Sequence, residues 1–174
     1  MKTTTKKQPK PKIKIELSQT DRFLELFSVL ILLGIWIMAL WNFRILPETV
    51  PSHFNTSGEI DQYDNKILVF FIPAIATIST IALLILSRHP HKYNYPFDVS
   101  EQTAPKVYAF SVRMIRTLNL GMLAVFAVTE LMIVRMTHGL NEKFAIWMML
   151  VFAILTITAF IYSVRKMSKL AKGV

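Results

Sequence analysis

Four long apolar segments constrain this chain more than any other feature of its 174 residues. Uncharged apolar runs cover about residues 26–43, 67–87 and 144–164, and a fourth extends from Arg116 to Met136, interrupted by Glu130. Each run is close to the ~20 residues that an α-helix needs to cross the hydrocarbon core of a bilayer. None has the polar stripe of a helix on the surface of a soluble protein. The sequence therefore predicts an all-α fold, a bundle of four transmembrane helices.

The apolar runs and their charged flanks define the expected domain organisation. Residues 1–17 form a basic tail in which Pro9 and Pro11 disfavour helix formation, so we expect this tail to be disordered. Residues 18–174 are expected to form a single membrane domain. Its helices are predicted at about residues 22–46, 66–87, 106–136 and 143–165.

A few polar residues and one proline predict local features of these helices. Ser18 or Thr20 together with Asp21 is typical of an N-terminal helix cap. Pro73 lies inside the second predicted helix and favours a kink there. Asn119, inside the third predicted helix, is expected to make a hydrogen bond between helices.

The basic residues are divided unevenly between the two ends of these helices. Sixteen of the twenty Lys and Arg residues precede the first helix, lie between the second and third, or follow the fourth. Only Arg44, Lys66, Arg135 and Lys143 fall on the other side. The positive-inside rule therefore predicts that both termini are cytoplasmic. The basic side is also expected to contact anionic lipid head groups.

Composition excludes several classes of function. The net charge of +9 is not accompanied by aromatic–basic interleaving or by a recognisable binding module, so we expect no nucleic-acid partner. The absence of cysteine excludes disulfides, thiol nucleophiles and cysteine metal sites. The first apolar run is too long for the core of a cleavable signal peptide and is expected to remain as an anchor. Nothing in the sequence indicates an oligomeric state.

A polar, turn-rich segment, residues 47–66, separates the first two predicted helices. The charge distribution predicts that it forms a structured extracytoplasmic loop. Asn, Gly and Asp in such a loop favour turns, and its lysine is placed to pair with an acidic side chain across the loop. The candidate binding residues in this loop are His53, Asn55, Gly58, Asp61 and Lys66.

His53 is compatible with several roles. It is a candidate metal ligand, a general base or a pH-responsive hydrogen-bond donor. His53, Asp61 and Glu130 are candidate ligands for a divalent metal, although zinc usually takes more nitrogen or sulfur ligands. The alternative is a histidine that orders the loop by bonding to backbone or to Glu130. The sequence has no Gly-rich phosphate loop, Ser–His–Asp set or His-Glu-x-x-His stretch, so it assigns no catalytic residue and no cofactor.

Glu130 is the one acidic residue within the four apolar runs. It lies fourteen residues beyond Arg116, which places it roughly 21 Å along the helix, near the level of the polar loop. An acidic residue at such a depth is a candidate functional group. One interpretation is a structural ion pair with Arg44, Lys66 or Arg135, and the other is a polar site shared with the loop.

The order of the loop residues resembles a known family. The pattern Pro51-x-His53-Phe54-Asn55-x-x-Gly58-x-x-Asp61-x-Tyr63-x-x-Lys66 between membrane helices is similar to the DUF1648 domain of bacterial membrane proteins, and the resemblance covers roughly residues 24–85. That domain occurs in the SdpI family, whose best-known member gives immunity to a secreted killing peptide. The resemblance implies a multi-pass protein of the bacterial cell membrane. It also implies that His53, Asn55, Gly58, Asp61 and Lys66 are the functional positions of the family motif.

Three functional hypotheses follow. The first, implied by the resemblance, is a non-enzymatic membrane protein that gives immunity to, or senses, an antimicrobial peptide or an envelope stress at the outer leaflet. A peptide toxin or a regulatory protein would then be its partner. The second is a membrane enzyme or metal-dependent site built on His53 and Glu130. The third is a small proton-linked transporter in which Glu130 carries the proton.

Overall fold

The fold consists mainly of four long helices. A computed structural model describes residues 10–55, 59–137 and 143–172. The helices are α1 (Gln19–Ile45), α2 (Phe71–Ser87), α3 (Ala104–Thr137) and α4 (Lys143–Ala171). Each has the length and apolar composition needed to cross a membrane, α2 together with the 3-10 turn Lys66–Phe70 that precedes it. These helices indicate a multi-pass membrane protein.

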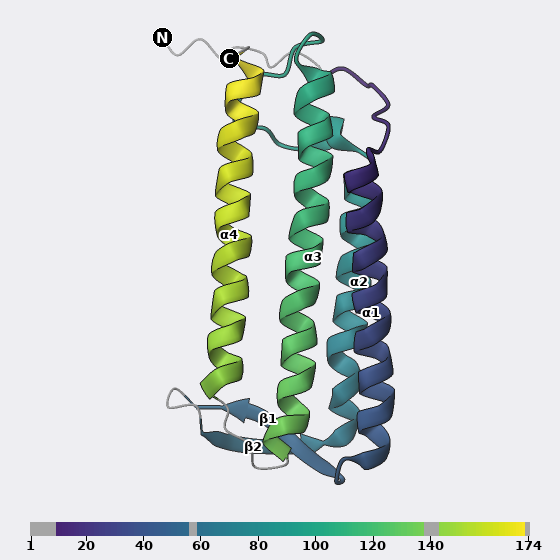
Figure 1. Cartoon of the computed structure of the whole chain (residues 1–174), viewed down its shortest axis with the longest axis vertical. Coiled ribbons are helices and arrows are strands. Elements are labelled where there is room, and N and C mark those ends of the chain that lie inside the picture. The colour runs from purple at the N-terminus through teal and green to yellow at the C-terminus, as the bar shows by residue number, and fades with distance from the viewer. Residues whose placement is uncertain (1–9, 56–58, 138–142, 173–174) are drawn as a thin grey trace, which may run out of the picture.

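Helix α3 lies at the centre of the arrangement and packs against each of the other three helices. Figure 1 shows α1 and α2 together on one side of α3 and α4 on the other. The start of α1, the end of α2, the start of α3 and the end of α4 share one end of the molecule, which we call the terminal end (Figure 1). A β-hairpin lies across the opposite, or hairpin, end.

The hairpin is the main departure from the predicted all-α fold. Strands β1 (Thr49–Phe54) and β2 (Ile60–Asn65) pair antiparallel within the segment expected to be a loop. The pairing is irregular around His53, where the register shifts on both sides. Such shifts are typical of a β-bulge, which bends and twists the bulged strand.

The local signals near the first two helices have different outcomes. Ser18 is the N-cap of α1 and forms a capping box with Asp21, as the sequence predicted. Pro73, in contrast, does not interrupt a helix interior, because α2 begins at Phe71 and is preceded by a 3-10 turn. Pro73 therefore occupies the first helical turn, where the missing N–H group costs no hydrogen bond within the helix.

The outer faces of the helices are strongly apolar. Large apolar side chains are more than half exposed along α1, α2 and α4, an arrangement that water disfavours and hydrocarbon accommodates. Exposed tryptophans occur in the last turns of α1 and the first turns of α4, both near the hairpin end, as expected at a membrane interface. The large apolar side chains that are more than half exposed include Phe23, Ile37, Trp41, Phe71, Ile78, Trp147, Ile154 and Tyr162.

Polar contacts between helices lie inside the bundle. Thr80 Oγ1 of α2 donates to Asn119 Oδ1 of α3 at 3.0 Å, which confirms the hydrogen bond predicted for Asn119. Trp36 Nε1 of α1 donates to Thr77 Oγ1 of α2 at 2.9 Å. Such bonds hold helices together where lipid gives no hydrophobic driving force for their association.

Candidate functional site: the hairpin and the buried polar pair beneath it

The base of the hairpin is fixed to the bundle by one charged side chain. Lys66 Nζ lies 3.0 Å from Glu48 Oε1 and 5.1 Å from the centre of the Phe43 ring. The Lys66 amide also donates to the Glu48 carbonyl at 2.9 Å. Lys66 thus makes the ion pair across the loop that its position predicted, and it joins the hairpin to α1.

An apolar cluster supports the same base. Val50 of β1 is buried with Leu46, Ala39 of α1 and Val69 of the 3-10 turn. Ile133 of α3 packs against this cluster. This packing places Val50 of the hairpin against α1 and the 3-10 turn, and so positions the hairpin on the bundle.

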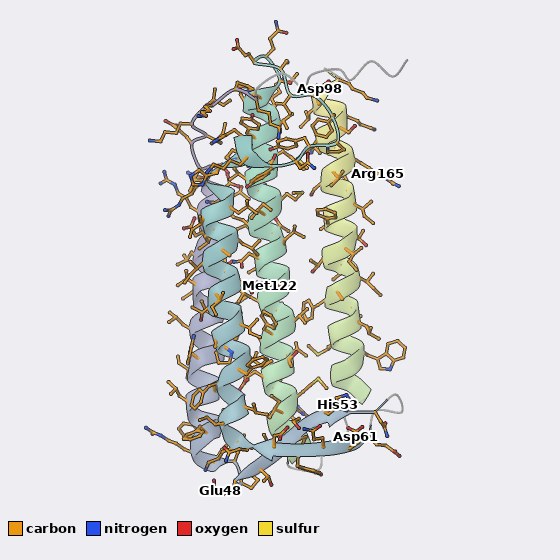
Figure 2. All side chains as sticks on the ribbon, turned by 180° about the vertical axis from the view of Figure 1, so that it is seen from behind. Glu48, His53, Asp61, Asp98, Met122 and Arg165 are labelled. Atoms are coloured by element: carbon orange, nitrogen blue, oxygen red, sulfur yellow. The ribbon has the colours of Figure 1, made fainter. Side chains whose placement is uncertain are left out.

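The far part of the hairpin is exposed and polar. His53 Nδ1 lies 2.6 Å from Asp61 Oδ1, with the two side chains 64% and 43% exposed. Figure 2 shows this pair on the α4 side of the hairpin, with Glu48 on the opposite side. Two of the predicted site residues therefore lie together, in a position open to solvent or to a partner.

Asn55 closes the strand pairing. Its backbone N–H donates to the Glu59 carbonyl at 2.9 Å, and its side-chain Oδ1 accepts from the Glu59 amide at 2.9 Å. This agrees with the turn-forming role expected of asparagine. Gly58 lies outside the described residues.

Glu130 is completely buried in α3 and contacts α1. Asn42 Nδ2 donates to Glu130 Oε1 at 3.4 Å, and both residues are 4% exposed or less. Glu130 Oε2 is buried without a hydrogen-bond partner among the described residues. In that part of the chain Glu130 makes no ion pair with Arg44, Lys66 or Arg135.

The exposed pair and the buried pair are separate. No hydrogen bond or ion pair joins His53 to Glu130 in the segments that the structure describes. Ile133, one turn beyond Glu130, already packs against the apolar cluster that contains Val50. Among the described residues the polar loop and the intramembrane acid thus make no direct contact, and apolar side chains pack at the hairpin base. A polar site shared by the two, one of the two interpretations of Glu130, stays a prediction.

The candidate metal ligands are divided by the same arrangement. Among the residues described, no group of three His, Cys, Asp or Glu side chains is placed to hold a metal ion. Asp61 accompanies His53, whereas Glu130 contacts Asn42 within the bundle. Metal binding at these residues stays a prediction, which metal analysis of the purified protein tests.

At the terminal end, two ion pairs connect α1 to α3. Arg113 Nε lies 3.1 Å from Asp21 Oδ1, and Arg116 Nη2 lies 3.2 Å from Glu25 Oε2. Sequence reasoning missed both pairs. The signal was present in the spacing, since residues three or four positions apart share a helix face: Asp21 with Glu25, and Arg113 with Arg116.

An aromatic cluster covers this end. Tyr95 Oη lies 2.8 Å from Ser111 Oγ and donates to the Pro90 carbonyl at 3.1 Å. Tyr93 Oη donates to the Leu86 carbonyl at 3.0 Å, and burial raises the pKa of Tyr93 to about 12. The connection between α2 and α3 is therefore held against the helices.

Comparison with known proteins gives a family match for the hairpin and its two flanking helices. A family model described as a domain of unknown function, DUF1648, matches residues 30–77. The chain is also 28% identical, over 88 residues, to an uncharacterized protein of the archaeon Archaeoglobus fulgidus. That alignment covers 46% of this chain and 48% of the relative, so it spans about half the length of the curated protein. No solved structure matches.

The DUF1648 match lies inside the segment for which the sequence predicted it. It includes most of α1, the hairpin and the start of α2. Asn42 lies within the match, and Glu130, its partner, lies outside it. Sequence reasoning missed Asn42, although an amide in an apolar run was the signal that could have identified it.

Proposed function

We propose that this membrane protein recognises an extended, basic peptide on the hairpin, in a protective or sensing role. The observation that carries the proposal is the outer edge of β2. Within the described residues the sheet has two strands, and β1 is the strand that packs against α3. Strand β2 is largely exposed, and its outer edge pairs with no other strand among the described residues, so it is a candidate edge for pairing with another chain.

The charge of the hairpin favours a basic partner. Residues 48–66 hold four of the eleven acidic residues of a chain whose net charge is +9, and they hold one lysine. Asp61 and Asp64 both belong to β2. Complementary charge steers association and selects among partners, while backbone hydrogen bonds along the strand edge supply the docking geometry.

A binding assay with matched peptides tests this mechanism. The probe is a synthetic peptide of alternating Lys and Val, compared with the same peptide N-methylated at alternate positions. We expect binding of the first and loss of binding of the second, because N-methylation removes the backbone donors. Binding that survives N-methylation would refute strand pairing.

A charge variant tests the role of the acidic strand. Asp61→Asn/Asp64→Asn should weaken the complex about tenfold, equivalent to about 1.4 kcal/mol. The control Asp98→Asn/Glu101→Gln removes two charges at the terminal end and should have little effect. Figure 2 places Asp98 at the end opposite Asp61. Equal weakening by both variants would show that binding depends on the net charge of the protein and not on the acidic residues of β2.

The biological role is tested in cells. Deletion of the gene should raise sensitivity to at least one basic peptide of a broad panel, and Asp61→Asn/Asp64→Asn should reproduce part of that effect. Unchanged sensitivity across the panel would contradict a protective role.

The proposal requires the hairpin to face outward and both termini to face the cytoplasm. The chain contains no cysteine, so single cysteines can be introduced without interference. Tyr63→Cys should react with an impermeant maleimide in whole cells, whereas Glu101→Cys should react only after lysis. The reverse pattern would invert the topology and refute recognition at the outer surface.

Proton-linked transport is a second candidate function, favoured by Glu130. This acid is fully buried inside a membrane-spanning helix, and one of its oxygens has no partner in the described part of the chain. Intramembrane acids of this kind occur in proton relays. Glu130→Gln should abolish a pH-driven flux into liposomes; absence of such a flux in the unaltered protein would exclude this candidate.

A further inference from the structure

The terminal end contains a cavity whose charged lining residues are mainly positive. Its volume is about 280 Å³, and it lies between the ends of the first three helices and residues 13–17. Three cationic side chains line it, Lys14, Arg88 and Arg116, against one carboxylate, Glu25. The rest of the lining is mostly apolar. The excess of positive charge indicates that this cavity suits an anion.

Arg116 supplies the most specific indication of a ligand. Its side chain is only 3% exposed, although it carries a full positive charge. Glu25 and the Val112 carbonyl accept from its two terminal nitrogens, but its Nε is buried without a hydrogen-bond partner among the described residues. A buried donor without an acceptor is unfavourable, so an oxygen atom that reached Arg116 Nε from the cavity would satisfy a group that the described residues leave unpaired.

The depth and size of the cavity define the chemical class of the ligand. Ser87 and Arg88, where α2 ends, belong to its lining, so it lies where the hydrocarbon core gives way to lipid head groups. Its volume lies just below the range of typical small-molecule pockets, about 300–1,000 Å³. Guanidinium groups match the geometry of phosphate oxygens. We propose that this cavity binds a phosphate group, carried by a phospholipid or by a small soluble molecule.

The test compares variants inside and outside the cavity. Binding of phosphatidylglycerol to the detergent-solubilised full chain is measured by native mass spectrometry, with phosphatidylcholine as the competing lipid. Lys14→Gln/Arg88→Gln alters two exposed cavity side chains and should preserve the fold. The matched control, Lys106→Gln/Lys169→Gln, removes two exposed charges at the same end that do not line the cavity.

We expect the cavity variant to weaken phosphatidylglycerol binding roughly 25-fold, since each basic group near a lipid surface contributes about fivefold. The control should change binding less than twofold. Arg116→Lys, which keeps the charge but loses the planar fork, should also weaken binding. Equal effects of the cavity and control variants, or no effect of either, would overturn the proposal.

A competition experiment identifies the source of the phosphate. If millimolar inorganic phosphate displaces phosphatidylglycerol from the unaltered protein but not from the cavity variant, the phosphate group alone is recognised. If inorganic phosphate does not compete while lipid binding remains sensitive to Lys14→Gln/Arg88→Gln, the ligand is the phospholipid. Both results support the cavity, whereas lipid binding that is insensitive to every cavity variant would exclude it.

Discussion

The packing of α4 depends on one glycine of α3. A Cβ atom added at Gly121 would lie 2.4 Å from Thr156 Oγ1 and 3.2 Å from Thr156 Cγ2 in α4. The first distance is about 1 Å shorter than an ordinary van der Waals contact, which begins at 3.4 Å. Gly34 in α1 is a matched control, because a Cβ atom there would meet no atom within 4 Å.

The difference between the two glycines gives the expected magnitude. Replacing glycine by alanine within a helix is worth about 0.5–1 kcal/mol, a gain that both substitutions share. Forcing an extra methyl group into a packed contact costs about 1–3 kcal/mol. We therefore expect Gly121→Ala to be less stable than Gly34→Ala by about 1–3 kcal/mol, with Gly34→Ala at or above the stability of the unaltered protein.

The assay is reversible unfolding in mixed detergent micelles, followed by circular dichroism. The double variant Gly121→Ala/Thr156→Ala should recover most of the loss relative to Thr156→Ala alone, because the nearest remaining atom, Cβ of residue 156, lies 3.4 Å away. Thr156→Ala serves as the reference since it also removes the hydrogen bond from Oγ1 to the Phe152 carbonyl. Equal stability of the two glycine variants would refute the packing argument.

Three further predictions concern polar groups that are wholly or partly buried. Asn42→Ala removes the donor to Glu130 and should lower the free energy of unfolding by about 1–3 kcal/mol in the same assay; unchanged stability would contradict this. Glu25→Gln breaks the ion pair with Arg116 and should lower the free energy of unfolding by an amount between the ~1 kcal/mol of an exposed pair and the about 3–5 kcal/mol of a fully buried one. The pair is intermediate because Glu25 is 32% exposed and Arg116 only 3%. Burial raises the pKa of Tyr93 from 10.0 to about 12, so the folded state binds more protons and stability should fall as pH rises through this window. Tyr93→Phe should remove this component of the alkaline decline, and identical profiles would contradict it.

Much of the fold followed from patterns that act locally in the sequence. The four helices were evident because an apolar run of sufficient length with few or no charges has few alternatives to a membrane helix. The cap at Ser18 and the bond between Asn119 and Thr80 depend on side chains whose chemistry restricts their partners. The ion pair of Lys66 with Glu48 was expected for the same reason.

The remaining features depend on contacts distant in sequence. The hairpin could not be predicted, because strands β1 and β2 are only six residues each and their sequences show no clear alternation of apolar and polar positions. Their pairing is also irregular around His53. The pairing of Glu130 with Asn42 depends on how α1 and α3 face one another, since 88 positions separate the two residues. Helix-length arithmetic placed Glu130 near the level of the hairpin but gave no information about the apolar side chains at the hairpin base.

The central position of α3 has a consequence for how the protein is made. Chains are synthesised from the N-terminus, so α1, the hairpin and α2 enter the membrane before α3 is complete. Until then Asn42 and Thr80 lack the partners that α3 supplies, and Asp21 and Glu25 lack their arginines. The first half of the chain must therefore persist for a time with unpaired polar groups. Its biogenesis then depends on how soon the third helix follows, and a stalled chain that ends before residue 104 would be a substrate for membrane quality control.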